Sequence, residues 1–507
     1  MNVMGDIARL GAKRYPDSPA VILGGDRLSY QDLEWRANAL AQRLAGLGVA
    51  PGDRCALLAE NCLEYPVAVF AVLKLGAVLV PLNFRYRASE VAYVVNDAAP
   101  SVLLHGAGYL DLAIEASLSV KHAVALVSLV DLVDEAARHG AAACPAVEVD
   151  PDAAAMVMYT SGTTGFPKGV LFSHRAYLSS IVGIALSGEL SRVDRVLVNL
   201  PLFHNGGLNA LLMPALAFGA CTVVSPAGFR PESVLACVEQ ERITLTMWVP
   251  TMLSMLVNSP QLQRFNLRTL QRIWYGSSPI APNLLATVRR CFPGVGLVQF
   301  YGMTETGMTS VLGPQDHEQR SQCTGREMFN AELRIVDEQL RDVGAGAIGE
   351  LLSRQSPLGM IGYLNNEKAS RETIVDGWIR TGDVARYEGD GFFTIVDRKK
   401  EMIISGAENI YPQEIENLIA SHPDVLEVAV FGIPDPVYGE SVSAAVVRRP
   451  GASVSSEDLR AWCAQRVASY KKPKQVEFMN ELPKNAAGKV TKHVLREPYW
   501  RGYNRSV

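Results

Sequence analysis

Apolar residues recur at two different spacings along residues 1–150, and the spacings predict alternating helices and strands. Residues 28–47 place apolar side chains at helical intervals, with Ser29 at a position suited to a helix N-cap. Residues 65–75 have the same helical character. Short apolar runs predict strands at residues 54–59, 77–82, 102–105 and 122–130. This alternation predicts an α/β architecture in which helices cover the sheets.

The last part of the chain has strand and helix signals of its own. A charged run at residues 397–400 comes first. Two strands are then predicted at residues 425–432 and 441–447, and a helix at residues 456–469. We therefore predict two domains, a large N-terminal one over residues 1–396 and a small α+β one over residues 397–507.

Residues 196–229 contain no Asp, Glu, Lys or Arg, and the run is long enough to cross a bilayer. Proline and glycine interrupt it at Pro201, Gly206, Pro214 and Gly219. We therefore predict a buried strand, a loop and a core helix here, not a membrane span.

The composition of the chain limits the kinds of ligand and the cellular location that we expect for the protein. Lys and Arg total 48 against 52 Asp and Glu, a net charge of −4 that lacks the basic excess of a nucleic-acid-binding protein. The 8 cysteines form no CxxC pair and no zinc-ligand spacing with histidine, which predicts reduced thiols in a cytoplasmic protein. The first residues meet Asp6 early and have no apolar core, so they do not predict a secretory signal.

A segment rich in glycine and hydroxyl groups follows the predicted strand at residues 155–159. Glycine amides, hydroxyls and an ammonium group can converge on an anion, so the segment predicts a phosphate cradle. The spacing of a Walker A loop is absent. The residues that we expect to form the cradle are Thr160, Ser161, Gly162, Thr163, Thr164, Gly165 and Lys168.

The segment at residues 299–306 carries three side chains that suit a nucleotide. Tyr301 can stack on a base, Thr304 can reach a phosphate, and Glu305 can hold Mg²⁺. A Tyr-Gly turn followed by polar residues is also common in ordinary loops, so this segment alone is a weak signal.

Two isolated charged residues complete the set. Asp383 follows a tight turn and can accept hydrogen bonds from a ribose diol. Lys489 lies beside Gly488, on a turn that can carry a lysine into a site. Taken alone, Asp383 is equally typical of a solvated turn, and Lys489 is more typical of an ordinary surface lysine.

In their order and separations these motifs resemble the adenylate-forming superfamily, over essentially the whole chain. The superfamily includes acyl-CoA synthetases, non-ribosomal peptide adenylation domains and beetle luciferases. Residues 276–279 are similar to its adenine-side loop, and residues 200–204 to its acyl-side strand. The resemblance implies helix-covered sheets with a small β-barrel-like part in the N-terminal domain. It also implies a mobile C-terminal domain.

The resemblance implies an AMP-forming ligase for a hydrophobic carboxylic acid, fatty or aryl. ATP, Mg²⁺ and CoA are the implied ligands, and acyl-CoA, AMP and pyrophosphate are the products of a route through an acyl-adenylate. An acyl-AMP ligase that loads a carrier protein stays open as the alternative. A catalytically silent nucleotide sensor, a luciferase-like oxygenase and a membrane transporter are competing hypotheses. The intact Lys168, Glu305, Asp383 and Lys489 argue against the sensor.

The family's roles carry over to this chain by position. Lys489 is implied to bridge the substrate carboxylate and the α-phosphate, with Lys168, Thr304 and the Mg²⁺ ligand Glu305 as the other catalytic residues. Asp397 is the implied hinge, about which the small domain rotates to bring Ser405 and Gly406 towards the thiol of CoA. Besides the phosphate cradle, the implied nucleotide contacts are Gly276, Ser277, Ser278, Tyr301, Gly302, Thr304, Asp383 and Arg398.

His204 stands where amino-acid-activating domains place an Asp, which argues against an amino-acid substrate. We expect His204 to gate the acyl pocket or thiol tunnel, with a purely structural histidine as the alternative. Gly206 and Gly207 are expected to leave room for the acid, and no arginine is placed for a second carboxylate. The expected substrate contacts are His204, Asn205, Gly206, Trp248, Gly276 and Met303.

The sequence leaves four properties open. These are the identity of the acid, the pathway, the oligomeric state, for which a homodimer is one option, and regulation by acetylation of Lys489.

Overall fold

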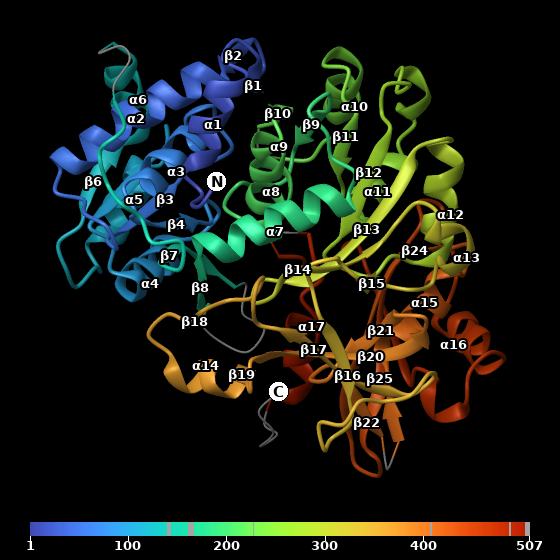
Figure 1. Cartoon of the computed structure of the whole chain (residues 1–507). Coiled ribbons are helices and arrows are strands. Elements are labelled where there is room, and N and C mark those ends of the chain that lie inside the picture. Colours follow the sequence, from blue (N-terminus) through green and yellow to red (C-terminus); the bar gives the residue numbers. More distant parts are fainter. Residues whose placement is uncertain (139–142, 161–166, 227, 406–407, 486–487, 502–507) are drawn as a thin grey trace.

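The computed structural model describes residues 1–138, 143–160, 167–226, 228–405, 408–485 and 488–501. Figure 1 shows a large N-terminal part, blue to yellow, and a smaller C-terminal part in orange and red. Mixed helices and strands make up both parts. The predicted fold class, a large helix-covered α/β part followed by a small one, is confirmed.

The first sheet is mostly parallel and is built from the predicted apolar runs. Its central strands pair β4 with β3 and β3 with β5 in parallel register, and the antiparallel β7–β8 pair extends it towards the site. The strand order in space is β18 (Gly362–Tyr363), β8 (Gly169–Ser173), β7 (Ala154–Tyr159), β4 (Val78–Leu82), β3 (Arg54–Leu58), β5 (Val102–His105) and β6 (Ala125–Ser128).

Helices cover this sheet, and the predicted helix at residues 28–47 is one of them. It begins at Tyr30 because the Ser29 hydroxyl accepts a hydrogen bond from the Asp32 amide, and the Asp32 carboxylate accepts one from the Ser29 amide. The strand predicted at residues 122–130 is shorter than expected because a helix begins at Leu129. The helices are α1 (Asp6–Arg14), α2 (Tyr30–Gly46), α3 (Glu64–Lys74), α4 (Ala88–Ala98), α5 (Leu110–Ser117) and α6 (Leu129–Arg138).

The second sheet is parallel in one half and antiparallel in the other. Its parallel half runs from β1 (Pro19–Leu23) and β10 (Cys221–Val224) through β9 (Arg195–Val198), β11 (Leu245–Met247) and β12 (Arg272–Gly276) to β13 (Gly296–Met303). Beyond β13 the sheet is antiparallel and turns towards the C-terminal part. Those strands are β14 (Gly307–Leu312), β15 (Gly325–Glu327), β21 (Phe392–Arg398), β20 (Trp378–Gly389), β17 (Ile348–Arg354) and β16 (Leu333–Val336). Short strands β2 (Asp26–Ser29) and β19 (Ile374–Val375) pair at its edges.

The helices of the second sheet lie between it and the first sheet, or on its outer face. The charge-free residues 196–229 form strand β9, a loop, a helical segment and strand β10, as predicted, and no helix among the described residues is both long and apolar enough to cross a membrane. These helices are α7 (His174–Ser187), α8 (Asn205–Gly207), the π-helix η1 (Leu208–Leu212), α9 (Met213–Ala217), α10 (Pro231–Gln240), α11 (Pro250–Val257), η2 (Leu262–Arg264), α12 (Pro282–Cys291), α13 (Asp316–Arg320) and α14 (Glu367–Thr373).

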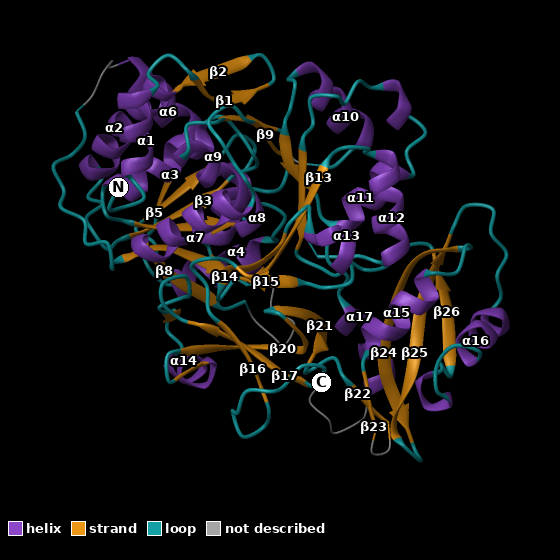
Figure 2. Cartoon of the chain, turned by 45° about the vertical axis from the view of Figure 1, so that its right-hand side comes forward, coloured by secondary structure: helices purple, strands orange, loops and turns teal. Residues whose placement is uncertain are grey.

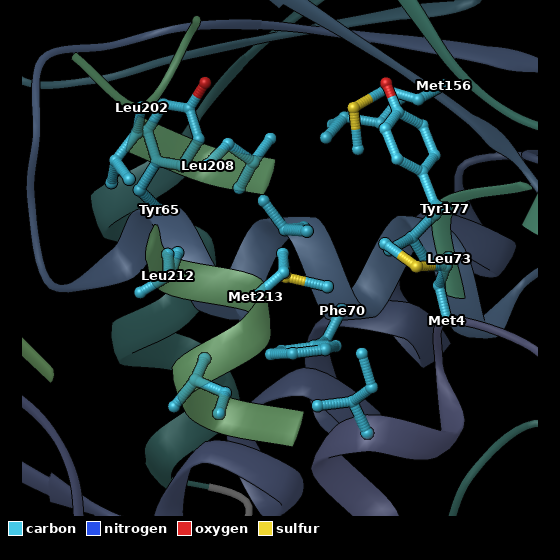
Figure 3. Close-up of a cluster of buried hydrophobic side chains, with 14 of the residues drawn as sticks. Met4, Tyr65, Phe70, Leu73, Met156, Tyr177, Leu202, Leu208, Leu212 and Met213 are labelled. Atoms are coloured by element: carbon cyan, nitrogen blue, oxygen red, sulfur yellow. The ribbon is translucent and has the colours of Figure 1, made fainter. Parts of the chain in front are cut away.

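A continuous apolar core joins the two sheets. Figure 3 shows Phe70 of α3 beside Met213 of the helical segment α8–η1–α9, and both are completely buried. Burying each such side chain stabilises the fold by roughly 1.5–3 kcal/mol. The core therefore holds α7 and α8 in fixed positions over the ends of the strands.

The C-terminal part has its own sheet and its own small core around Ile415, Val430 and Val446. In Figure 2 this sheet lies apart from the N-terminal layers, with β20 and β21 between them. The predicted helix at residues 456–469 ends at Ala464. The elements are β22 (Ile403–Ser405), β23 (Glu408–Ile410), α15 (Pro412–Ala420), β24 (Val425–Asp435), β25 (Gly439–Arg448), α16 (Ser456–Ala464), η3 (Ser469–Lys471), β26 (Gln475–Met479) and α17 (Lys492–Trp500).

Replacing Ser29 with alanine is expected to lower the free energy of unfolding by about 1 kcal/mol, because α2 loses the side chain that caps its first turn. Urea unfolding with hydrogen exchange of the α2 amides measures the change. Ser29→Asn is the matched control, since asparagine caps a helix about as well as serine. Equal losses in both variants would show that the cap is not what the helix depends on.

Candidate active site

The β13–β14 turn, helices α7 and α8, and a C-terminal hairpin surround a cavity of about 710 Å³. A second cavity of about 350 Å³ lies beside it, and Ser277, Gly302 and Lys489 line both. The shared residues make the two cavities neighbours within one site. The site is therefore assembled from segments far apart in the sequence.

The described residues of the predicted nucleotide site divide between the two cavities. Those at the larger cavity are Thr160, Lys168, Ser277, Gly302, Thr304, Glu305, Arg398 and Lys489. Those at the smaller cavity are Gly276, Ser277, Ser278, Tyr301, Gly302, Asp383, Arg398 and Lys489. Ser161, Gly162, Thr163, Thr164, Gly165 and Gly406 lie outside the described residues.

The buried carboxylate of Asp383 is held from two sides. The Tyr301 hydroxyl donates a hydrogen bond of 2.6 Å to Oδ2, and Arg398 Nε lies 3.0 Å from Oδ1. Asp383 and Arg398 face each other across the β20–β21 pair, so the strand register itself creates the ion pair. Burial and the Asp383 charge raise the pKa of Tyr301 well above its usual value, so the hydroxyl stays protonated. The group can present carboxylate oxygens to a diol.

The loop after β12 lies against the smaller cavity because β12 and β13 approach each other closely. A Cβ at Gly276 would meet the Phe300 carbonyl oxygen, so only glycine fits there. Ser277 has φ of +67°, which turns the chain so that Ser277 and Ser278 line the cavity. Tyr301 lines the same cavity, and its ring meets Phe393 edge-on at 6.0 Å.

The phosphate cradle is described only at its ends. The Lys168 amide donates to Thr160 Oγ1 at 3.3 Å, and the Thr160 amide donates to the Lys168 carbonyl at 3.0 Å. These two hydrogen bonds hold the described ends of the cradle, Thr160 and Lys168, next to each other. The Lys168 ammonium lies 4.9 Å from the centre of the Tyr363 ring.

Glu305 is the residue that fits a divalent cation. Its side chain is buried, and Tyr363 donates a hydrogen bond of 2.8 Å to Oε1. The described residues contain no group of three or more His, Cys, Asp or Glu side chains that could hold a metal. Mg²⁺ is commonly held by one or two carboxylates together with substrate phosphates. A single carboxylate beside a phosphate cradle therefore suits a metal that arrives with its nucleotide.

Lys489 reaches the cavities from a tight hairpin of the C-terminal part. The Lys489 amide donates to Asn485 Oδ1 at 2.9 Å, and Gly488 has φ of +78°. A Cβ at Gly488 would lie 3.1 Å from Thr251 Oγ1, so the hairpin lies directly against α11. Burial, with help from the Arg398 charge, lowers the pKa of Lys489 to about 8. The ammonium is thus poorly solvated and ready to meet an anion.

The acyl end of the larger cavity is lined by β8, α7, the α8–η1 segment, β14 and Leu358. The His204 Nδ1 atom accepts a hydrogen bond of 3.2 Å from the Gly206 amide. Burial lowers the pKa of His204, so it is neutral near pH 7 with its proton on Nε2. The lining residues at this end are Phe172, Tyr177, Ser180, Ile184, His204, Asn205, Gly206, Asn209, Ala210, Met308 and Leu358.

Two expectations about the acyl pocket are wrong. Trp248 lies in the core beneath the second sheet, completely buried against Phe292, and does not line either cavity. Gly207 does not leave room for the acid, because the Leu200 and Pro201 carbonyls occupy the space next to it, whereas Gly206 lines the larger cavity. Gly276 lines only the smaller cavity, whereas Met303 lines the larger one with His204 and Asn205.

The predicted hinge residue lies at the end of β21. The Asp397 carboxylate accepts hydrogen bonds from the Gln413 amide of α15 at 3.0 Å and from the Arg398 amide at 2.7 Å. Burial raises the pKa of Asp397 to about 6. Ser405 pairs with Glu408 and Gly439 in the C-terminal sheet and lines neither cavity, so the structure does not bring it to the site.

Sequence reasoning missed several residues of the site. Tyr363 contacts both Lys168 and Glu305, and Tyr177 lines the acyl end. Glu350 accepts hydrogen bonds from Arg380 at the rim of the larger cavity. None lies in a motif with a spacing of its own, so only the folded chain identifies them.

Comparisons with known proteins agree with this geometry. A family model described as "AMP-binding enzyme" matches residues 9–364, and one described as "AMP-binding enzyme C-terminal domain" matches residues 414–489. The indoleacetate–CoA ligase of Aromatoleum aromaticum is 39% identical over 490 residues, covering 95% of each chain. A feruloyl-CoA synthase from Amycolatopsis is 36% identical over 490 residues, covering 96% of this chain and 97% of that protein. A crystal structure of the anthranilate CoA ligase AuaEII with anthranoyl-AMP superposes with a TM-score of 0.91 at 26% identity, covering 98% and 97% of the two chains.

Replacing Tyr301 with phenylalanine is expected to weaken ATP binding by about twofold to tenfold, because Asp383 loses one hydrogen bond and is held less rigidly. Isothermal titration with ATP measures the change. Tyr301→Ala, which also removes the ring from the smaller cavity, should weaken binding further. Unchanged affinity in the phenylalanine variant would contradict a role for the hydroxyl.

Proposed function

The chain belongs to the AMP-binding enzyme family, and we propose that it joins a hydrophobic, compact aryl carboxylic acid to CoA. The reaction consumes ATP and releases AMP and pyrophosphate through an acyl-adenylate. One observation supports this most directly. Lys489 from the C-terminal part lines the same cavity as Lys168, Glu305 and the uncharged acyl end.

The first half-reaction is displacement at phosphorus. A carboxylate oxygen of the acid attacks the α-phosphorus of ATP, the bond from that phosphorus to the bridging oxygen breaks, and pyrophosphate leaves. Negative charge spreads over the phosphates in the transition state, so positioned cations supply most of the catalysis. Lys489 meets the charge at the α-phosphate, and Lys168 meets it at the leaving group. Glu305 would hold Mg²⁺, which neutralises phosphate charge when bound.

The ribose and base occupy the smaller cavity in this proposal. Asp383, oriented by Tyr301 and Arg398, accepts hydrogen bonds from the ribose hydroxyls. The loop at Ser277 and Ser278 lies along the base. These contacts are the same in substrate and transition state, and they position the α-phosphate for in-line attack.

The second half-reaction forms the thioester. The sulfur of CoA attacks the acyl carbon, the bond to the AMP oxygen breaks, and AMP leaves with the electron pair. The small domain, residues 397–507, rotates about Asp397 for this step, which moves Lys489 out and Ser405 in. Among the described residues, Asn283 donates to the Ala420 carbonyl at 2.6 Å and Arg449 to Asn258 at 3.2 Å, and such exposed contacts are of the kind that a domain rotation can break.

Charge distribution supports the choice of acid. Among the described lining residues, the charged side chains lie at the nucleotide end, and the acyl end carries none. The aromatic side chains Phe172 and Tyr177 and the neutral His204 line the acyl end. An acid with an uncharged ring fits this lining, whereas a second carboxylate would be buried without a partner. The names of the feruloyl and indoleacetate relatives describe acids of this kind.

The proposal includes a cytoplasmic location for the enzyme. The cysteines are all free, as expected of an enzyme that works in the reducing cytoplasm.

The test is AMP release with ATP and Mg²⁺ against a panel of acids, with and without CoA, with the thioester confirmed by mass. We expect CoA-dependent turnover with cinnamates, benzoates or arylacetates, and much less with dicarboxylates. Preferred turnover of a dicarboxylate would overturn the assignment of the acid. Acyl-AMP that accumulates without thioester would replace CoA with a carrier protein as the acceptor.

Replacing Lys489 with alanine is expected to reduce acyl-AMP formation by roughly 10²–10³-fold, because one positioned charge on the transition state is lost. Thioester formation from supplied acyl-AMP should be largely spared. Separate assays of the two half-reactions measure both. Lys474→Ala is the matched control, since this lysine pairs with Asp435 on the surface of the same part. Equal loss of both half-reactions would contradict the assigned role.

The pKa of Lys489 allows a second test of its proposed role in adenylation. The pKa is lowered to about 8, so the cation is lost as the pH rises through that value. The kcat/KM for adenylation should therefore fall on the alkaline side in the wild type, because it reports the free enzyme. The residual activity of Lys489→Ala should lack this limb.

A further inference from the structure

A two-residue strand brings a distant segment to the phosphate cradle. Strand β18 pairs Tyr363 with Val170 and Gly362 with Leu171, directly after the cradle. The Ile361 amide donates to the Leu171 carbonyl and the Leu364 amide to the Gly169 carbonyl, both at 2.8 Å. In Figure 1, β18 lies next to β8 at the end of the first sheet, although the two strands are far apart in the sequence.

The Tyr363 side chain points from this strand to two functional residues at once. Its hydroxyl donates a hydrogen bond of 2.8 Å to Glu305 Oε1. Its ring lies 4.9 Å from the Lys168 ammonium, within the range of a cation–π interaction. Tyr363 and Glu305 are each only 8% exposed, so the hydrogen bond between them is shielded from water.

The geometry leaves one face of the carboxylate for a ligand. Oε1 of Glu305 is occupied by Tyr363, whereas Oε2 accepts no hydrogen bond from the part of the chain that the structure describes. The backbone of Glu305 is fixed from the same segment, since the Met360 amide donates to the Glu305 carbonyl at 2.9 Å. Both the position and the orientation of the carboxylate thus depend on residues 360–363.

We propose that Tyr363 is a positioning residue that couples the metal ligand Glu305 to the phosphate cation Lys168. Its hydroxyl turns Oε2 of Glu305 towards the metal, and its ring holds the Lys168 ammonium over the cradle. The metal and the lysine then meet the phosphates of one nucleotide in a fixed relation. The proposal rests on the proposed function, because it assumes that Mg²⁺ and ATP bind here.

The physical reason is the precision that phosphoryl displacement requires. Glu305 lies on the β13–β14 turn and Lys168 at the start of β8, so they belong to different sheets. Tyr363 is the described side chain that contacts both of them. Residues that orient a metal ligand typically change metal affinity or activity by about 10–100-fold when they are replaced.

Two variants separate the contributions of the hydroxyl and the ring. Tyr363→Phe keeps the ring beneath Lys168 and removes the hydrogen bond to Glu305. Tyr363→Leu removes both. Isothermal titration with ATP, once with Mg²⁺ in excess and once with a chelator, measures affinity without catalysis.

We expect Tyr363→Phe to bind metal-free ATP like the wild type and Mg²⁺–ATP about tenfold more weakly. Tyr363→Leu should bind both forms more weakly. In turnover assays the Mg²⁺ concentration for half-maximal rate should rise in Tyr363→Phe, while the KM for the acid stays unchanged. A Tyr363→Phe variant that binds both forms of ATP like the wild type, or loses both equally, would overturn the proposal.

A double variant tests the coupling directly. In a Glu305→Gln background, Tyr363→Phe should cause little further loss of Mg²⁺–ATP affinity, because the carboxylate that it orients is gone. Additive losses would overturn the proposal. Tyr65→Phe is the matched control for folding, because Tyr65 is completely buried and its hydroxyl has no hydrogen-bond partner among the described residues. If wild-type protein bound no ATP, the proposed function itself would fail, which the wild-type titration distinguishes from failure at Tyr363.

Discussion

The ion pair between Asp383 and Arg398 is the constraint on which the rest of the site depends. A carboxylate only 3% exposed needs compensation, and Arg398 at 3.0 Å with Tyr301 at 2.6 Å supplies it. Arg398 is also the residue after Asp397, whose carboxylate accepts a hydrogen bond from the first turn of α15. The nucleotide site and the junction of the two parts therefore share a backbone segment. A ligand that tightens one necessarily biases the geometry of the other.

The larger cavity has two chemically different ends, one lined by charged side chains and one by uncharged side chains. The nucleotide end gathers the lysines and arginines of both parts, and mutual repulsion and burial lower the pKa of Lys489. Carboxylates such as Glu350 and Asp383 pair with some of these cations, Arg380 and Arg398 among them. The acyl end is neutral because burial also keeps His204 uncharged. The reacting carboxylate is thus drawn to the boundary, with its tail in the neutral end and its charge facing Lys489.

Local signals were sufficient for several helices and strands and for recognising the polar motifs, because both depend on residues close in sequence. Ser29 caps α2 through Asp32 only three residues away, and Lys489 depends on its own Gly488 turn. Predictions failed at residues that could face either the core or the cavity. Trp248 follows strand β11 and turns into the core, and Gly207 is needed where the Leu200 and Pro201 carbonyls approach closely. The sequence did not predict the contacts of Tyr363, for a related reason. Its importance comes from a pairing with β8, nearly 200 residues earlier in the chain, that no short pattern encodes.

The same reasoning explains why the C-terminal part can be both well placed and movable. Its own core closes around Ile415, Val430 and Val446 without help from the N-terminal part. Hydrogen bonds such as those of Asn283 and Asn258 cross between the two parts, and such contacts exchange readily with water. The Lys489 hairpin lies against Thr251 of α11. In the proposed mechanism, the departure of pyrophosphate removes much of the negative charge that faces Lys489, and the polar contacts between the two parts are the ones that the proposed rotation would break.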